Sequence, residues 1–189
     1  FLGSWYVRFL SQRLFANSHN LPLMIVDDGE FENRNLMAQY CYPRYLGSSK
    51  AERAGETATR FNLQSETVIR RFDAASDFDT CLVVDCLDNV ESRFLAHQLA
   101  ENKGVPIVHL SVCPHSFGMV EWNDKWSLNP MKQLAPIDFT QVEIDPCELI
   151  RYQEIGVKIA VRGAVVTGHW LATGETLSYH LTDMETTPL

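Results

Sequence analysis

The chain has 189 residues, 46% of them hydrophobic, and a formal net charge of −8. This length and composition suit one large α/β domain that buries a core. The negative charge argues against a nucleic-acid partner, because phosphate backbones are bound by Lys and Arg. The five cysteines are scattered without a C-x-x-C pair, which indicates a cytoplasmic protein with no disulfide framework and no zinc knuckle.

The N-terminal third predicts a helix, a strand and a second helix. Residues 4–15 place apolar side chains at helical spacing. Residues 21–26 form a short apolar run that ends at Asp27, which is typical of a buried parallel strand. The second helix is predicted to begin near Ser49, which pairs with Glu52 as a capping box.

The middle of the sequence continues the alternation. It predicts two strands, a helix and another strand, at residues 67–72, 80–86, 89–102 and 105–112. In the helix, the apolar Phe94, Leu95 and Leu99 are expected to face inward. The order of these elements predicts a mostly parallel sheet with crossover helices.

The character of the sequence changes after residue 112. Residues 113–153 are rich in loops and proline, and an added strand, a helix and a last strand are predicted at residues 117–122, 154–172 and 176–182. Lys158, Arg162 and His169 interrupt the longest apolar stretch, so this stretch predicts a buried helix and not a membrane span.

Carboxylates follow two of the predicted strands. Asp27 ends the first strand and has two interpretations, a ligand of ribose hydroxyls or the start of a turn. Asp85 and Asp88 follow the strand predicted to be most buried, where one of them can hold a magnesium ion bound to ATP phosphates. The alternative is that Asp88 or Asn89 caps the following helix.

Lys50 lies at the start of a predicted helix, where its charge opposes the helix dipole. Contact with a phosphate explains this position, and a solvated side chain is the alternative. His109, His115, His169 and His180 lack the spacing of metal ligands, so we interpret them as core or surface residues.

Together these residues form an ordered pattern: V-D-x-x-x-F-x-x-x-N-L-x-x-Q, then G-x-x-K, then D-C-x-D-N-x-x-S-R. The pattern resembles that of the ThiF/MoeB/E1 family, over about residues 1–112. The resemblance implies a Rossmann-like, three-layer α/β fold whose mostly parallel sheet has antiparallel additions in its C-terminal part. It also implies that residues 1–189 form a single domain, with residues 113–153 as its crossover-loop region.

The resemblance assigns expected roles to individual residues. It implies that Asp27 binds ribose and that Asn35 and Gln39 line the ATP site. It also implies that Lys50 contacts a phosphate and that Asp88 positions magnesium and ATP. Asn89 and Arg93 match the rest of the D-N-x-x-x-R run. Gly3 matches the last glycine of the family's glycine-rich loop, but Phe1 stands at a glycine position. The first strand and most of this loop are therefore expected to be missing from the sequence.

One further departure concerns the phosphates. Ala38 replaces the arginine of the family's N-L-x-R-Q motif, and Arg34 or Arg44 is a candidate substitute. Some members also use a cysteine of the crossover loop for a thioester or persulfide. Cys147 has that position, although an ordinary free cysteine is the alternative.

The function implied by the resemblance is adenylation of the C-terminus of a ubiquitin-like or sulfur-carrier protein. ATP and Mg²⁺ are the expected cofactors, and Lys50, Asp88 and Cys147 are the candidate catalytic residues. A homodimer or heterodimer in the cytoplasm is expected, with no nucleic-acid or membrane partner. Two alternatives remain open: a degenerate E1-like subunit that binds a partner without adenylating it, and an NAD-dependent oxidoreductase whose ribose ligand is Asp27.

Overall fold

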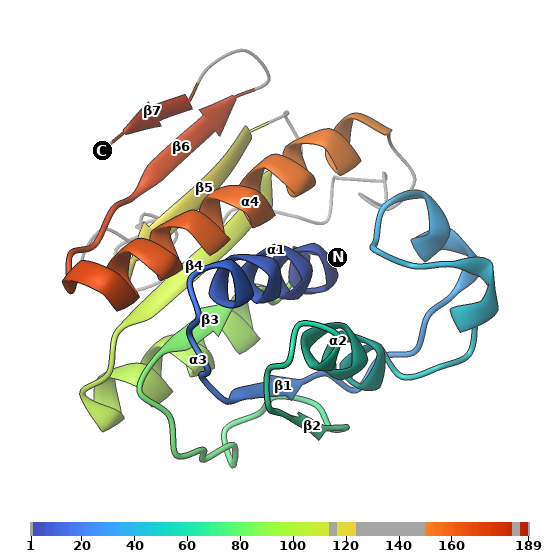
Figure 1. Ribbon diagram of the computed structural model, residues 1–189, viewed down its shortest axis with the longest axis horizontal. Coiled ribbons are helices and arrows are strands. Elements are labelled where there is room, and N and C mark those ends of the chain that lie inside the picture. The colour runs from blue at the N-terminus through green and yellow to red at the C-terminus, as the bar shows by residue number, and fades with distance from the viewer. Residues whose placement is uncertain (1, 114–116, 124–149, 183–185, 189) are drawn as a thin grey trace.

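The computed structural model describes residues 2–113, 117–123, 150–182 and 186–188 (Figure 1). Its helices are α1 (Leu2–Ala16), η1 (Asn33–Met37), η2 (Pro43–Tyr45), α2 (Lys50–Thr59), α3 (Val90–Lys103) and α4 (Ile150–Thr173), where η marks a short 3-10 helix. Its strands are β1 (Leu23–Val26), β2 (Ser65–Val68), β3 (Val83–Asp85), β4 (Ile107–Cys113), β5 (Phe117–Trp122), β6 (Tyr179–Thr182) and β7 (Thr186–Pro188).

The strands form one sheet of two and one sheet of five, with parallel pairs first and antiparallel pairs after them. β1 pairs in parallel with β2, and β3 pairs in parallel with β4. The five-stranded sheet then continues in the order β4-β5-β6-β7 through antiparallel pairs. The predicted α/β fold with antiparallel additions in the C-terminal part is confirmed.

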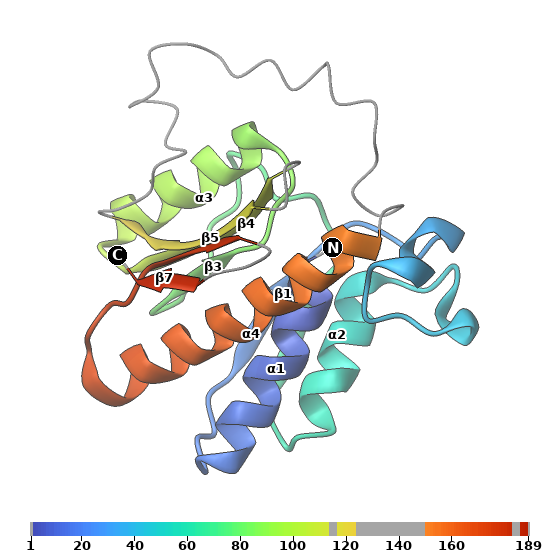
Figure 2. The same ribbon diagram turned by 90° about the horizontal axis from the view of Figure 1, so that it is seen from above.

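The elements stack in three layers. α3 covers one face of the five-stranded sheet, whereas α1 and α4 lie against the other face (Figure 2). α1 lies between α4 and α2 and contacts both (Figure 1). The main core is formed where α1 and α4 meet the sheet, by buried residues that include Leu10, Leu14, Leu110, Val120, Ile155 and Ile159.

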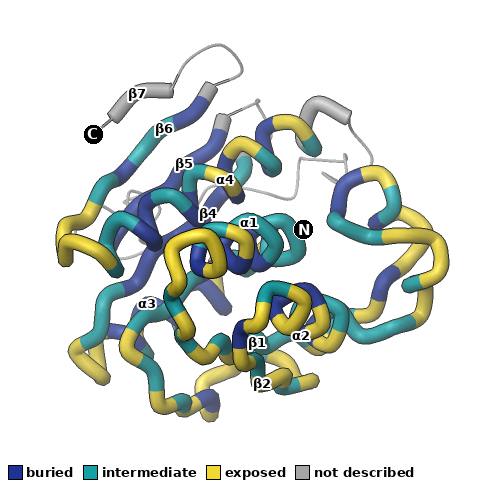
Figure 3. The backbone as a smooth tube through the Cα atoms, viewed as in Figure 1, coloured by how far each residue is buried: buried dark blue, intermediate teal, exposed yellow. Residues whose placement is uncertain are grey.

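Burial follows this layering. Buried residues follow the central strands and the inner sides of α1 and α4, whereas β2 has no buried residue (Figure 3). α4, predicted as a buried helix, buries one side and exposes the other, with Ile155 and Ile159 fully buried and Val161 37% exposed. Within the described ranges, every helix is too short or too polar to traverse a lipid bilayer.

Three details of the sequence-based prediction are wrong. The strand predicted at residues 67–72 is β2, Ser65–Val68, because its pairing with β1 ends at Val68. The strand predicted at residues 80–86 is shortened to β3, Val83–Asp85, the part that pairs with β4.

The third correction concerns the buried face of α3. Phe94, Leu95 and Leu99 are only half-buried. The buried residues of the helix are Ser92, Arg93, Ala96, His97 and Ala100. The face of α3 that packs on the sheet is therefore mostly small and polar, because Arg93 contacts Asp85 of β3 and His97 contacts His109 of β4.

Candidate functional site

Asp27 and Lys50 approach each other around Gly29. The Oδ1 atom of Asp27, which directly follows β1, accepts a hydrogen bond of 2.7 Å from the backbone N–H of Gly29. A Cβ atom placed on Gly29 would stand 3.0 Å from Asp27 Oδ1 and 3.1 Å from Lys50 Nζ. A side chain at position 29 would require the tips of Asp27 and Lys50 to shift, so the glycine allows a carboxylate and an ammonium group to lie on the same side of it after a parallel strand.

Backbone pairing between two distant segments brings Lys50 to this position. Phe31 N–H donates to Ser48 O at 3.0 Å, and Lys50 N–H donates to Gly29 O at 2.9 Å. The side chain of Ser49 then caps α2 by accepting from Glu52 N–H at 3.4 Å. The predicted helix start is confirmed, and Lys50 is the first residue of the helix.

Asn35 and Gln39 are buried within the turn that follows β1. The Oδ1 atom of Asn35 accepts from Glu32 N–H at 2.9 Å, and the carbonyl oxygen of Asn35 accepts from Gln39 N–H at 2.8 Å. Asn35 is 2% and Gln39 5% exposed. These bonds hold the η1 turn together. Whether either side chain also lines an ATP site stays a prediction.

Asp85 is buried and engaged by three donors. Its Oδ1 accepts from Leu87 N–H at 2.8 Å, and its Oδ2 accepts from Arg93 Nη1 at 2.9 Å. His109 Nδ1 lies 2.7 Å from the same Oδ2 atom. Because Asp85 is 1% exposed and its oxygens already have these partners, the structure favours Asp88 over Asp85 as the carboxylate available to a ligand.

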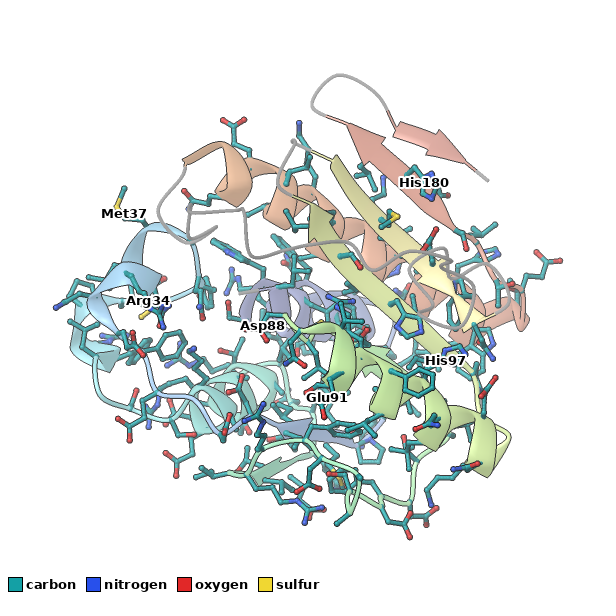
Figure 4. All side chains as sticks on the ribbon, turned by 180° about the vertical axis from the view of Figure 1, so that it is seen from behind. Arg34, Met37, Asp88, Glu91, His97 and His180 are labelled. Atoms are coloured by element: carbon teal, nitrogen blue, oxygen red, sulfur yellow. The ribbon has the colours of Figure 1, made fainter. Side chains whose placement is uncertain are left out.

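Asp88 lies exposed at the N-terminal end of α3 (Figure 4). Its Oδ1 receives a weak hydrogen bond of 3.3 Å from Asn89 Nδ2. Asn89 itself caps α3, since its Oδ1 accepts from Ser92 N–H at 2.8 Å. The capping interpretation therefore applies to Asn89, and Asp88 retains oxygens that face solvent.

Gly3 lies in the first turn of α1, beside the residue that follows Asp85. A Cβ atom on Gly3 would stand 3.7 Å from Cys86 Cβ. The structure thus brings the first turn of α1 next to the end of β3. Asp27 and Lys50 both lie beside Gly29, and Asp88 contacts Asn89.

Ala38 is fully buried, and aromatic side chains occupy its surroundings. Trp5 Nε1 donates to Ala38 O at 2.7 Å, and the Trp5 and Tyr40 rings stand 5.3 Å apart. Arg34 forms an exposed ion pair of 2.7 Å with Glu32 and lies on the segment at the edge of the molecule (Figure 4). Whether Arg34 or Arg44 substitutes for the family's arginine stays a prediction.

Cys41 and Cys86 lack the environment of a nucleophile. Burial is the main cause that raises the pKa of Cys86 to about 12, and the Asp85 carboxylate adds to it. Burial also raises the pKa of Cys41. A raised pKa keeps a thiol protonated and unreactive. The candidate Cys147 lies outside the described residues.

Two buried histidines form a polar network that sequence reasoning missed. His97 Nδ1 lies 3.1 Å from His109 Nε2, and the opposite nitrogen of His97 lies 3.4 Å from Glu101 Oε1. The network therefore runs from Asp85 through His109 and His97 toward the surface of α3, where His97 is labelled in Figure 4. The spacing of the histidines in the sequence carries no signal of it, because the partners come from three different elements.

Comparisons with known proteins agree with this architecture. The ThiF family profile matches residues 13–145. The crystal structure of PaaA superposes with a TM-score of 0.69 at 17% identity, covering 100% of this chain and 61% of PaaA. E. coli MccB with AMPCPP and MccA gives a TM-score of 0.70 at 10% identity, covering 97% of this chain and 60% of MccB.

A second MccB structure, with ATP, gives a TM-score of 0.70 at 10% identity and covers 95% of this chain and 59% of MccB. The chain thus spans about three fifths of the length of these proteins. No curated protein sequence matches it. At such low identities the superpositions show the shared Rossmann-like fold, and the family profile covers well over half of the chain. The chain belongs to the ThiF family.

Proposed function

We propose that this protein uses ATP to adenylate the C-terminal carboxylate of a small carrier protein or peptide, with ubiquitin-like and sulfur-carrier proteins as the expected class. The observation that carries the proposal is the convergence of Asp27 and Lys50 around Gly29 in a ThiF-family chain. A carboxylate beside an ammonium group, after a parallel strand, suits ribose hydroxyls on one side and a phosphate on the other. The solved MccB structures with ATP, and with AMPCPP and MccA, support a nucleotide and a small protein or peptide as the two substrates.

The chemical step needs no covalent nucleophile from the protein. A carboxylate oxygen of the carrier attacks the α-phosphorus of ATP, the bond from that phosphorus to the bridging oxygen breaks, and pyrophosphate leaves with the electron pair. The contribution of the protein is to align the two substrates and to neutralise phosphate charge. Lys50 is suited to the second task, because its Nζ atom is held near Gly29 at the start of α2.

Asp88 fits a magnesium ion that is shared with phosphate. Mg²⁺ is typically held by one or two carboxylates together with substrate phosphates and waters. The Asp88 side chain is exposed, and its described contact is a single long hydrogen bond from Asn89. When bound, the ion would supply charge neutralisation at the phosphates.

ATP–pyrophosphate exchange tests the proposal directly. The full chain is incubated with labelled pyrophosphate, Mg-ATP and candidate carriers that end in a free carboxylate. We expect exchange that depends on the carrier and that falls at least about tenfold in Asp88→Asn and Lys50→Ala. Glu91→Gln, which removes a carboxylate from the first turn of the same helix, is the matched control and should retain exchange. Carrier binding without exchange would exclude adenylation by this chain.

A degenerate E1-like subunit is the second candidate, and the buried Ala38 favours it, because the family's arginine is missing there. This candidate predicts carrier binding without Mg-ATP binding. Calorimetry with Mg-ATP separates the two functions, since heat of binding that disappears in Lys50→Ala supports the enzyme. The alternative of a dinucleotide oxidoreductase is not proposed, because membership of the ThiF family accounts for Asp27 without it. Dimerisation and a cytoplasmic location stay predictions.

A further inference from the structure

Three cations of α2 and its C-terminal end line one small cavity. Lys50, Arg53 and Arg60 meet there with residues from the first turn of α1 and from the segment before α2. The other polar lining residues include Ser4, Tyr40 and Tyr45. Arg53 lies one turn beyond Lys50 on the same side of the helix. The cavity is thus continuous with the Lys50 end of the candidate nucleotide site.

Arg53, which lines this cavity, has an unsatisfied donor. Its Nη1 atom pairs with Glu56 Oε1 at 2.6 Å. Its Nε atom is buried and has no hydrogen-bond partner. A buried guanidinium N–H without an acceptor is costly, and it indicates that a ligand oxygen belongs there.

Tyr45 occupies the position that an anion would take among the arginines. Its hydroxyl oxygen accepts from Arg44 Nη2 at 3.0 Å and from Arg60 Nη2 at 3.3 Å. The Arg53 guanidinium lies 5.5 Å from the centre of the Tyr45 ring. The hydrogen bond from Arg60 is the main cause that lowers the pKa of Tyr45, and Arg44 adds to it. Three guanidinium groups therefore surround one phenol.

These cations stand where the family's usual phosphate arginine is absent. Ala38 is buried beneath Trp5, so position 38 has no room for a long cationic side chain. Tyr40, two residues later, lines the cavity and packs against Trp5 with its ring tilted by 55°. Arg53 and Arg60 thus contribute cationic side chains to a cavity that Tyr40 also lines.

We propose that Arg53 and Arg60, beside Lys50, bind the phosphate tail of the nucleotide and that the Tyr45 hydroxyl gives way to phosphate oxygens. This inference rests on the proposed nucleotide site and assigns it a phosphate clamp of its own. The cavity measures about 10 Å³, which is close to the minimum for one water molecule. Phosphate entry therefore requires Tyr45 to move. Tyr45 ends η2, a helix of three residues, so its side chain can turn outward without disturbing α2.

Inorganic tripolyphosphate is the probe, because it carries the phosphates without the nucleoside. Calorimetry on the full chain should show binding that weakens about tenfold in both Arg53→Gln and Arg60→Gln, the loss expected for a charge-assisted hydrogen bond. The affinity for adenosine should stay unchanged. Arg162→Gln is the matched control, because Arg162 also stacks on a tyrosine, Tyr179, at 5.2 Å, but lies on α4. Circular dichroism verifies that each variant is folded.

Tyr45 supplies a second readout. Tyr45→Phe removes the competing acceptor, so tripolyphosphate should bind at least as tightly as to the unmodified chain. The ultraviolet difference spectrum between the chain and Tyr45→Phe reports ionisation of this phenol. Bound tripolyphosphate should move that ionisation to higher pH, because the hydrogen bonds from Arg60 and Arg44 are lost and negative charge is added.

The outcomes separate this inference from the proposed function. The inference is overturned if tripolyphosphate does not bind, or if its binding weakens equally in Arg162→Gln. It is also overturned if the affinity for tripolyphosphate is unchanged in Arg53→Gln and Arg60→Gln. Weaker binding by Tyr45→Phe overturns the displacement of its hydroxyl. Arginine-dependent binding without pyrophosphate exchange supports the clamp and contradicts adenylation. Exchange with an unchanged KM for ATP in both arginine variants supports adenylation and contradicts the clamp.

Discussion

At the scale of single residues, Gly29 sets how closely Asp27 and Lys50 approach. Its φ angle lies outside the left-handed region, so the glycine is required by space and not by backbone conformation. The two groups that a Cβ would meet are the tips of side chains, 3.0 and 3.1 Å away. A methyl group there would displace the Lys50 ammonium from the end of β1 without disturbing the core.

Gly29→Ala should therefore weaken Mg-ATP binding by roughly tenfold, because a contact with a charged group is lost or lengthened. The free energy of unfolding should change by less than about 1 kcal/mol, since the site lies at the surface. Calorimetry and denaturant unfolding measure the two effects separately. Glu30→Ala changes the exposed neighbouring residue and is the control. Equal ATP affinity in both variants would show that the approach of Lys50 to Asp27 has no part in binding.

The start of α2 at Lys50 was predicted because its signal, the Ser49 cap, is local. Asp27 and Gly29 are near neighbours in the chain, whereas Lys50 reaches them through backbone pairing between residues 29–31 and 48–50. Partners across elements were missed. The sequence could not show that Arg93 and His109 contact the Asp85 carboxylate, because these contacts form only when α3 and β4 pack onto β3.

At the scale of elements, the N-terminus of α3 combines a structural residue with a candidate ligand. Asn89 caps the helix through its 2.8 Å bond from Ser92 N–H and donates to Asp88. An effect of replacing Asn89 on ATP binding therefore has two sources. One source is a loss of stability at the helix start, and the other is a change in the orientation of Asp88.

Asn89→Ala and Asn89→Ser make this separation. Alanine removes the cap and should lower the free energy of unfolding by about 1 kcal/mol, whereas serine is itself a good cap and should retain most of it. Neither variant keeps the amide N–H that donates to Asp88. If this donor orients Asp88 for magnesium, both variants should raise the KM for Mg-ATP to a similar degree. A KM that rises only in Asn89→Ala would assign the effect to helix fraying instead.

Element boundaries were predicted well for helices and less well for the short strands. The capped starts of α2 and α3 carry local signals in Ser49 and Asn89. β2 lacks such a signal: it begins with the polar Ser65 and Glu66, and its length is fixed by the four residues of β1 that it pairs with. Hydrophobicity alone therefore shifted the strand toward the following apolar residues.

At the scale of the whole molecule, α4 braces α1 against the five-stranded sheet. The close approach depends on Gly163. A Cβ atom there would stand 2.7 Å from Leu110 Cδ2 on β4 and 3.2 Å from the Tyr6 ring on α1. Leu110 is fully buried, and the Tyr6 hydroxyl is held by Thr167 at 2.9 Å. Neither neighbour has free space to move into.

The layered fold was predictable because the order of strands and helices constrains topology, and the antiparallel additions were predicted correctly. The contact between α1 and α4 was not predicted. These two helices are separated by most of the chain, and the glycine that allows their contact with β4 looks like any other small residue in the sequence.

Gly163→Ala tests the close packing of α4 on α1 and β4 through the sign of the change in the free energy of unfolding. In an exposed helix the change from glycine to alanine stabilises by about 1 kcal/mol. Overpacking of a filled core costs about 1–3 kcal/mol, so here the net free energy of unfolding should fall by up to about 2 kcal/mol. Val161→Ala, on the exposed side of the same helix, should change it little. Urea unfolding of the full chain measures both variants. A more stable Gly163→Ala would mean that helix propensity prevails and that the interface of α4 with α1 and β4 is looser than the structure shows.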